Sequence, residues 1–265
     1  MKLLRFLFFI LLPLISSAAA GVDLAKGSFS MSAGAEFSTG KYGGTTPTDI
    51  FYLPVTVRYA TYRYSASLTV PYISVTSDGG VIPNSGGAVR GNRNMATTSS
   101  AMRRSLVQSG LGDVIATAGY TLYDDDELML SAVGQVKFGT ANADKDLGTG
   151  ENDYAAQIDS ICTTDSVSIY ASVGYKFVGV PAGYTLNNIG YGSVGVSRAV
   201  GSASRVGLTL DVAQRTSAIS EDRRSITAET RHGINESTAI SVSLSRGFSA
   251  SNADWLGGLY VANTF

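Results

Sequence analysis

The chain has 265 residues, a formal net charge of −1 at pH 7 and only 15% charged residues. This length suits one domain or one barrel, and the absence of a basic stripe argues against nucleic acid as a partner. Cys162 is the only cysteine, so an internal disulfide is excluded.

The first 20 residues are typical of a cleaved signal peptide. Lys2 and Arg5 form a basic start, residues 6–15 are apolar, and small residues at 18–20 precede a cleavage site. No later apolar run approaches the roughly 18 residues that a membrane helix needs. The sequence therefore predicts a signal peptide over residues 1–20 and an exported domain over residues 21–265.

From about residue 27 onward, apolar and polar side chains alternate in about twelve runs of roughly 9 to 14 residues. The pattern is clear from Phe51 to Tyr59, from Val167 to Phe177 and from Val206 to Val212. The polar positions are mostly Ser, Thr, Gly and Ala, which suits a confined lumen better than the surface of a soluble sandwich. Aromatic residues end many apolar faces, as in an interfacial girdle: Tyr59, Tyr64, Tyr72, Tyr120, Phe138, Tyr154, Phe177 and Trp255.

The connections between these runs alternate in length. Short gaps lie near 60–62, 124–126, 163–165, 200–203 and 233–236, and longer gaps at 39–48, 77–110, 140–151, 179–186, 215–222 and 249–253. Outer-membrane barrels have short periplasmic turns and longer outer loops, and closure removes the sheet edges that a membrane does not tolerate. The sequence therefore predicts an all-β fold, a closed antiparallel transmembrane β-barrel of about 12 strands in a bacterial outer membrane.

The last run resembles the C-terminal signal that outer-membrane insertion machinery reads. Trp255, Leu259, Val261 and Phe265 share one parity and end the chain on an aromatic residue. We therefore expect three kinds of partner, namely this machinery, the lipid and lipopolysaccharide of the membrane, and a small-molecule solute.

Ionisable residues of the strands are expected to point inward, because Arg or Lys on the lipid face costs ~2–4 kcal/mol at the membrane midplane. The ten predicted lumen residues are Glu36, Arg58, Asp113, Lys137, Asp153, Asp159, Lys176, Asp211, Glu229 and Arg231. They either form a paired, hydrated lumen that holds the shape of the barrel, or line a permeation path and set its charge preference. Their mixed signs argue against a strongly cation- or anion-selective ring.

The segment 77–110 is the longest irregular stretch. It is rich in Gly, Ser and Asn and contains Arg90, Arg93, Arg103 and Arg104. A loop of this length is usually functional or disordered. Three roles remain open: a disordered or lipopolysaccharide-binding surface loop, a gate folded into the lumen, and a site for an anionic ligand. If the loop is a gate, removal of residues 80–105 should raise conductance.

Neither a metal nor a cofactor is predicted. Asp144, Asp146, Glu151 and Asp153 cluster in one long loop, but Leu147 stands where an EF-hand requires glycine, so a solvated acidic loop is favoured. The run at 124–126 is typical of a turn.

An enzyme is not expected either. His232 is the only histidine, and the predicted topology puts it at the periplasmic end of the tenth strand. A hydrolase like outer-membrane phospholipase A needs its base near the outer leaflet.

Three segments carry a family resemblance. Gly110–Val114 resembles a G-L-G-D strand entry, residues 137–154 resemble an L-P-T-G…L-G-T-G…D-Y segment, and residues 51–72 fit an early hairpin. Together they cover roughly residues 50–155 and are similar to outer-membrane transporters of the meta-pathway of phenol degradation family. The resemblance implies passive passage of small molecules, hydrophobic or aromatic ones among them. The alternatives are a plugged structural or surface-interaction barrel and, third, an outer-membrane hydrolase.

Overall fold

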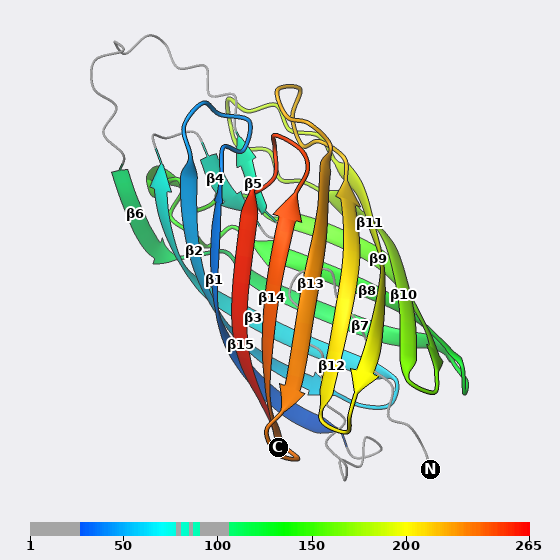
Figure 1. Ribbon diagram of the computed structural model, residues 1–265. Helices are drawn as coiled ribbons and strands as arrows, with labels where there is room; N and C mark the ends of the chain where they lie inside the picture. The colour runs from blue at the N-terminus through cyan, green and yellow to red at the C-terminus, as the bar shows by residue number, and fades with distance from the viewer. Residues whose placement is uncertain (1–26, 78–80, 85–86, 91–105) are drawn as a thin grey trace.

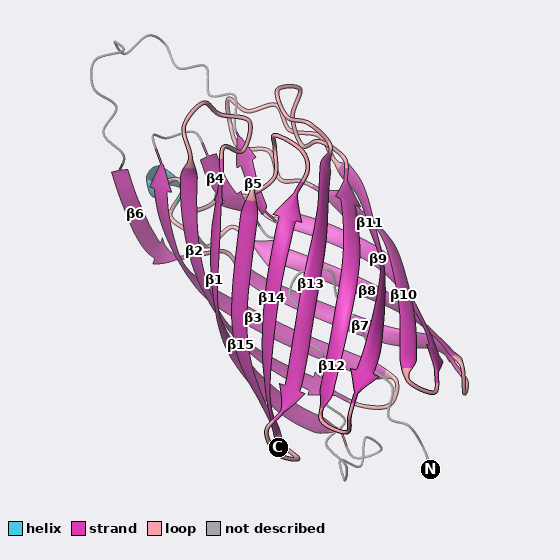
Figure 2. Ribbon diagram, in the orientation of Figure 1, coloured by secondary structure: helices cyan, strands magenta, loops and turns pink. Residues whose placement is uncertain are grey.

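The computed structural model describes residues 27–77, 81–84, 87–90 and 106–265. The predicted signal peptide lies outside these residues, as do Arg93, Arg103 and Arg104 of the predicted gate. Strands make up most of the described chain, and the one helix among the described residues is a short 3₁₀ helix, η1 (Ala143–Lys145) (Figure 2). Within the described residues, no helix has the length and apolar character to cross a membrane.

Fifteen strands occur in the described residues. They are β1 (Ser28–Gly40), β2 (Thr48–Ala60), β3 (Tyr64–Ser77), β4 (Val81–Asn84), β5 (Gly87–Arg90), β6 (Leu106–Leu111), β7 (Val114–Asp124), β8 (Leu128–Phe138), β9 (Asp153–Thr164), β10 (Val167–Phe177), β11 (Ile189–Val200), β12 (Ser204–Ala213), β13 (Arg223–Gly233), β14 (Thr238–Gly247) and β15 (Trp255–Thr264).

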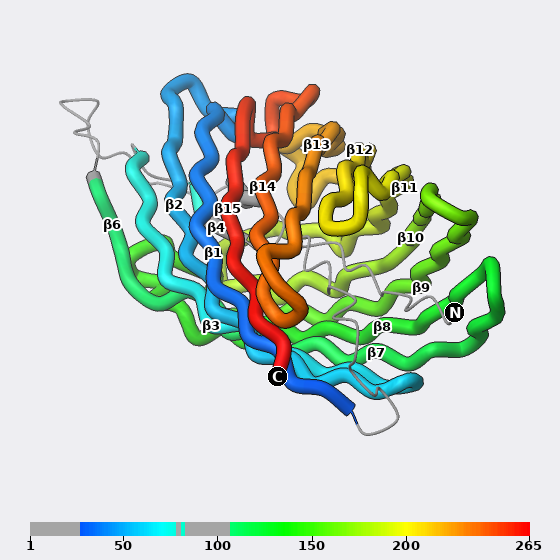
Figure 3. The backbone as a smooth tube through the Cα atoms, turned by 60° about the horizontal axis from the view of Figure 1, so that its bottom comes forward, coloured from blue at the N-terminus to red at the C-terminus, as the bar shows by residue number. Residues whose placement is uncertain are grey.

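The sheet closes on itself as a barrel. Strands adjacent in the chain pair antiparallel from β1 to β3 and from β7 to β15, and β15 then pairs with β1 from Ser30↔Thr264 to Thr39↔Trp255. β6 and β7 both pair with β3 and form one interrupted wall strand, whereas β4 and β5 form a separate hairpin. The wall therefore has twelve strands, and the predicted fold is confirmed (Figures 1 and 3).

The two ends of the barrel differ as predicted. Connections of two to four residues join strands at one end, at 61–63, 125–127, 165–166, 201–203 and 234–237. Side chains fix some of these turns: Asp125 Oδ1 accepts hydrogen bonds from the N–H groups of Glu127 (2.9 Å) and Leu128 (2.7 Å). The N–H of Phe265 donates to the carbonyl of Phe29 at 2.8 Å, so β15 ends at this same, periplasmic end.

The outer face of the barrel is apolar. In β12, Val206, Leu208, Leu210 and Val212 are 44–47% exposed, although they are the most apolar residues of the strand. All eight aromatic residues of the predicted girdle are exposed, and Phe29–Tyr59 and Tyr64–Tyr120 contact each other near the periplasmic end. An exposed apolar belt around a closed barrel is the exterior of a transmembrane protein of the bacterial outer membrane.

Candidate functional site

One cavity runs along the inside of the barrel. It has a volume of about 400 Å³, and every one of the twelve wall strands contributes to its lining. It extends from Arg58, two residues before the periplasmic end of β2, to Tyr42 and Ser251 in the loops at the outer end. The cavity is therefore long and narrow, and it follows the barrel rather than opening to one side.

The ten residues predicted to face the lumen all point to the inside, but not all reach the cavity. Eight line it: Glu36, Arg58, Asp113, Lys137, Asp159, Lys176, Asp211 and Glu229. Asp153 and Arg231 are buried beside it. Of the four arginines assigned to the gate, only Arg90 lies in the described backbone, as the last residue of β5.

A buried ion network closes the wall near the outer mouth. Lys137 Nζ donates hydrogen bonds to Asp113 Oδ2 at 2.7 Å and to the carbonyl of Glu151 at 2.8 Å, and lies 3.8 Å from Asp153 Oδ2. Asp113 Oδ1 accepts a hydrogen bond from the N–H of Ala141 at 2.9 Å. This network ties β7, β8 and β9 to the loop at 139–152.

Glycine and threonine of the same segment allow the loop to fold this closely. A Cβ on Gly148 would lie 2.9 Å from a carboxylate oxygen of Asp113, and a Cβ on Gly139 would collide with the backbone of Gly150. Thr140 Oγ1 accepts a hydrogen bond from the N–H of Val114 at 2.9 Å. The motif residues that carry the family resemblance therefore fix a loop. Among the residues that the structure describes, no group of three or more His, Cys, Asp or Glu side chains is arranged to hold a metal ion.

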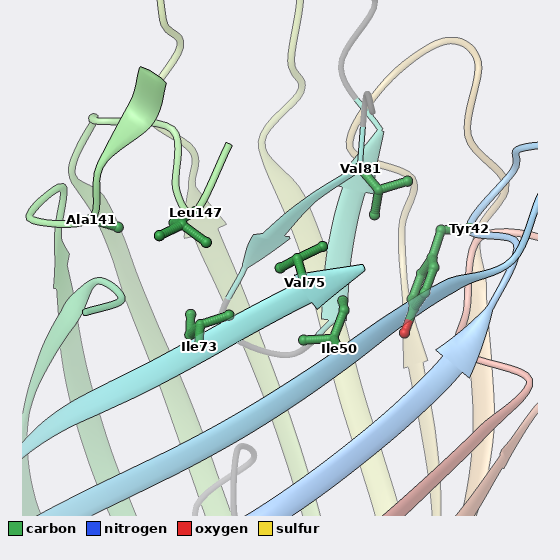
Figure 4. Close-up of a cluster of buried hydrophobic side chains, with 7 residues drawn as sticks. All are labelled: Tyr42, Ile50, Ile73, Val75, Val81, Ala141 and Leu147. Atoms are coloured by element: carbon green, nitrogen blue, oxygen red, sulfur yellow. The ribbon is translucent and has the colours of Figure 1, made fainter. Parts of the chain in front are cut away.

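The same loop brings an apolar side chain over the mouth of the cavity. Leu147 is 1% exposed and belongs to a cluster with Tyr42, Ile50, Ile73, Val75, Val81 and Ala141, which we call the mouth cluster (Figure 4). Val81 comes from the hairpin within the segment 77–110, and Tyr42 from the first outer loop. Burial raises the pKa of Tyr42 to about 12, so its phenol stays neutral at physiological pH and donates to or accepts from Ser38 Oγ at 2.9 Å. Neutral side chains from the first outer loop, from β2, β3 and β4, and from the loop at 139–152 therefore pack together at the outer mouth.

Three tyrosines lie across glycines of the neighbouring strand inside the barrel. The pairs are Tyr260 with Gly34, Tyr170 with Gly195 and Tyr191 with Gly174, each directly opposed in the sheet register. A Cβ at any of the three glycines would overlap the tyrosine ring. The hydroxyl groups are then held in place, because Tyr260 donates to Glu36, Tyr191 donates to Gln157 Oε1 at 3.0 Å, and Tyr170 bonds to Thr209. The glycines thus let large rings lie flat on the wall.

Sequence reasoning missed several inward groups. Arg223 lines the cavity, and Arg205 Nη1 donates to Ser197 Oγ at 3.0 Å and to Ser168 Oγ at 3.2 Å. Both could have been found from strand parity, because Arg223 shares the parity of Glu229, and Arg205 that of Asp211. The tyrosine–glycine pairs required the strand register, which parity does not give.

His232 lies where the topology predicted, one residue before the periplasmic end of β13. Its Nδ1 is 2.9 Å from Ser204 Oγ, and the imidazole is exposed. This contact joins two strands at the periplasmic rim, away from the cavity.

The comparisons with known proteins agree with this architecture. The model of the family described as "Putative MetA-pathway of phenol degradation" matches residues 28–265. The chain belongs to this family. The match covers the whole barrel, whereas the motifs in the sequence covered only its first half. No curated protein matches the chain in sequence.

Solved structures share the fold of this family member. The COG4313 outer membrane channel from Pseudomonas putida F1 is 11% identical, with a TM-score of 0.66 over 90% of this chain and 96% of the other. The NanC porin is 8% identical, with a TM-score of 0.58 over 89% of this chain and 98% of the other. The KdgM porin is 11% identical, with a TM-score of 0.56 over 89% of this chain and 99% of the other. At these sequence identities, the similarity shows a shared fold.

Proposed function

We propose that the protein is a narrow outer-membrane channel for the passive passage of small molecules, including hydrophobic and aromatic ones. The observation that supports this best is the cavity inside the barrel, whose lining extends from Arg58 near the periplasmic end to Tyr42 and Ser251 at the outer end. A barrel that serves only as a scaffold has no need of such a cavity. Movement would follow the concentration gradient, since passage along a fixed lumen requires no energy input.

The mouth cluster favours solutes with an apolar body. Leu147, Ile73 and Ile50 of this cluster line the cavity, and their side chains offer no hydrogen bonds to a hydrated solute. A constriction of this kind disfavours hydrated ions and passes an apolar surface at lower cost. The solved structures with the same fold agree in class, since one is an outer membrane channel and two are porins.

The second candidate is a plugged barrel with a structural or surface-interaction role. The same mouth cluster supports this second candidate, because buried apolar contacts between loops are also expected if the loops close the outer end of the lumen permanently. The two candidates differ in solute flux, which a seal abolishes.

Single-channel conductance of the refolded mature barrel in a planar bilayer tests the proposal, followed by liposome uptake of a neutral aromatic solute such as benzyl alcohol. Current steps or accelerated uptake would support a channel. A correctly folded barrel that passes neither ions nor benzyl alcohol, even after removal of residues 80–105, would contradict it.

A further inference from the structure

Four carboxylates of the lumen follow a repeated arrangement. Across β1, β15, β14 and β13, Glu36 is opposed to Gly258, Gly258 to Ser243, and Ser243 to Glu229. Two carboxylates are thus separated by two small residues in one row around the wall.

A second row repeats the pattern on the next four strands. Across β9, β10, β11 and β12, Asp159 is opposed to Ser172, Ser172 to Ser193, and Ser193 to Asp211. Since neighbouring strands lie about 4.8 Å apart, the two carboxylates of a row start about 14 Å apart along the wall. The four carboxylates of the two rows, which we call the acidic rows, all line the same cavity.

The small residues between them leave room for a solute. Ser172 and Ser193 bond to each other through their hydroxyl groups at 2.9 Å, so both remain close to the wall. On the other row, a Cβ on Gly258 would lie 2.8 Å from Ser243 Oγ and 3.5 Å from Glu36 Cγ. Larger side chains at these positions would fill the space between the carboxylates.

None of the four carboxylates forms an ion pair with a described residue, in contrast to Asp113 and Asp153, which share Lys137. Asp159 is the clearest case, because its side chain is only 4% exposed and lines the cavity. Its Oδ1 accepts a hydrogen bond from Gln157 Nε2 at 2.7 Å, and its Oδ2 has no hydrogen-bond partner among the described residues. A buried carboxylate oxygen in this position is stabilised when a cation or hydrogen-bond donor occupies the lumen beside it.

The cationic side chains of the lining lie toward its ends. Lys137 and Lys176 are each one residue from the outer end of their strands, Arg223 begins β13 at the same end, and Arg58 lies near the periplasmic end. Tyr170 and Tyr191 lie two residues from Ser172 and Ser193 of the second row. Tyr191 and Tyr170 both line the cavity beside the row of Asp159 and Asp211. Aromatic faces attract organic cations, and carboxylates pair with them.

We propose that the middle of the lumen is a binding site for small organic cations, amines with an aromatic or alkyl body, held by the acidic rows and the rings of Tyr170 and Tyr191. This inference rests on the proposed channel function and names the solute class that the lumen retains. The apolar body would pass the mouth cluster, and the ammonium group would then replace the missing counter-charge of Asp159 and Asp211.

Three probes of equal size test the proposal: benzylammonium, benzyl alcohol and benzoate. Their uptake into liposomes containing the refolded barrel is compared, and benzylammonium binding to the detergent-solubilised barrel is measured by calorimetry. We expect benzylammonium to exceed benzoate by on the order of tenfold in uptake, because the acidic rows place carboxylates along the lumen and a wall section of one charge sign concentrates the opposite ion. The double variant Asp159→Asn, Asp211→Asn should remove most of this difference and weaken the binding.

Glu236→Gln, which removes an exposed carboxylate from a periplasmic turn, is the matched control and should change nothing. Correct folding of each variant is checked by circular dichroism and by the heat-dependent shift on electrophoresis. Asn retains the Oδ1 acceptor for Gln157, so the hydrogen bond of Asp159 is preserved in the variant.

The outcomes separate the two proposals. Uptake of benzyl alcohol with equal uptake of both ions would overturn the cation site and leave the channel intact. Binding of benzylammonium without uptake of any probe would support the site and overturn the channel. Preference for benzoate, or a cation preference that survives the double variant, would overturn the site.

Discussion

Lys137 Nζ and Asp113 Oδ2 are 2.7 Å apart, and both side chains are almost fully buried at the outer mouth of the barrel. The ammonium group also reaches the carbonyl of Glu151 and lies near Asp153. One ammonium group thus interacts with two carboxylates and, through the carbonyl of Glu151, holds the loop at 139–152. The pair therefore links the family motifs to the shape of the mouth.

Replacement of this lysine is expected to be strongly destabilising. Lys137→Met leaves the buried carboxylate of Asp113 without its ion-pair partner, and breaking a buried pair in this way costs about 3–5 kcal/mol. The free energy of unfolding, measured in urea with the barrel in lipid vesicles, should fall by an amount of this order.

Lys145→Met is the control for the lysine variant, because Lys145 is an exposed residue of the same loop. It should leave the unfolding free energy within about 0.5 kcal/mol of the wild type. Equal stability of Lys137→Met and Lys145→Met would show that the buried pair does not hold the loop.

The mouth cluster predicts a second effect, on conductance. Leu147→Ala shortens the side chain that closes the cluster, and truncation of a buried leucine costs about 2–5 kcal/mol of stability. The single-channel conductance should rise, because the shorter side chain widens the outer mouth. Leu122→Ala is the control, since Leu122 is 54% exposed on the outer face. Unchanged conductance in a folded Leu147→Ala barrel would show that Leu147 does not limit passage at the outer mouth.

Strand parity was enough to predict the fold and the inward residues. The alternation of Val206, Leu208 and Leu210 with small residues gives the face of each side chain, and the alternation of gap lengths gives the two ends of the barrel. Parity gives neither the position of a residue along the barrel axis nor its neighbour on the adjacent strand. From the sequence, the mixed signs of the predicted lumen charges argued against strong charge selectivity. The register adds that Asp159 and Asp211 lie in one row, whereas Lys137 lies near the end of its strand.

The burial of Leu147 could not be predicted from the sequence, for a different reason. It follows three charged residues in a loop that looks solvated, at residues 144–146. Its burial depends on the hydrogen bond from the N–H of Ala141 to Asp113, which is distant in sequence. Contacts of this kind arise only when β7 and β8 are placed side by side, so local pattern does not predict them.

The tyrosine–glycine pairs predict a third effect, on the width of the lumen. Gly195→Ala places a methyl group where the ring of Tyr170 lies, so the ring must move away from the wall. We expect a loss of about 1–3 kcal/mol from this overpacking and a lower conductance, because the displaced ring enters the cavity.

The control for the glycine variant is Gly134→Ala, since a Cβ on Gly134 meets nothing within 4 Å. It changes the same residue type in another wall strand. If both variants conduct like the wild type, the ring of Tyr170 does not limit the lumen.

The lipid-facing side of β12 offers a test of the membrane position that is independent of the lumen. Leu208 lies in the middle of the strand and Val212 near its outer end, and both side chains face outward. Leu208→Arg should destabilise the barrel by about 2–4 kcal/mol and Val212→Arg by about 0–1 kcal/mol, because the cost of arginine falls toward the interface. The two variants add the same charge to the same face and differ only in depth. Equal losses of unfolding free energy, measured in urea with the barrel in lipid vesicles, would mean that the membrane is not centred on the middle of the strands. The assignment of the mouth cluster to the outer end of the membrane-spanning region would then be wrong.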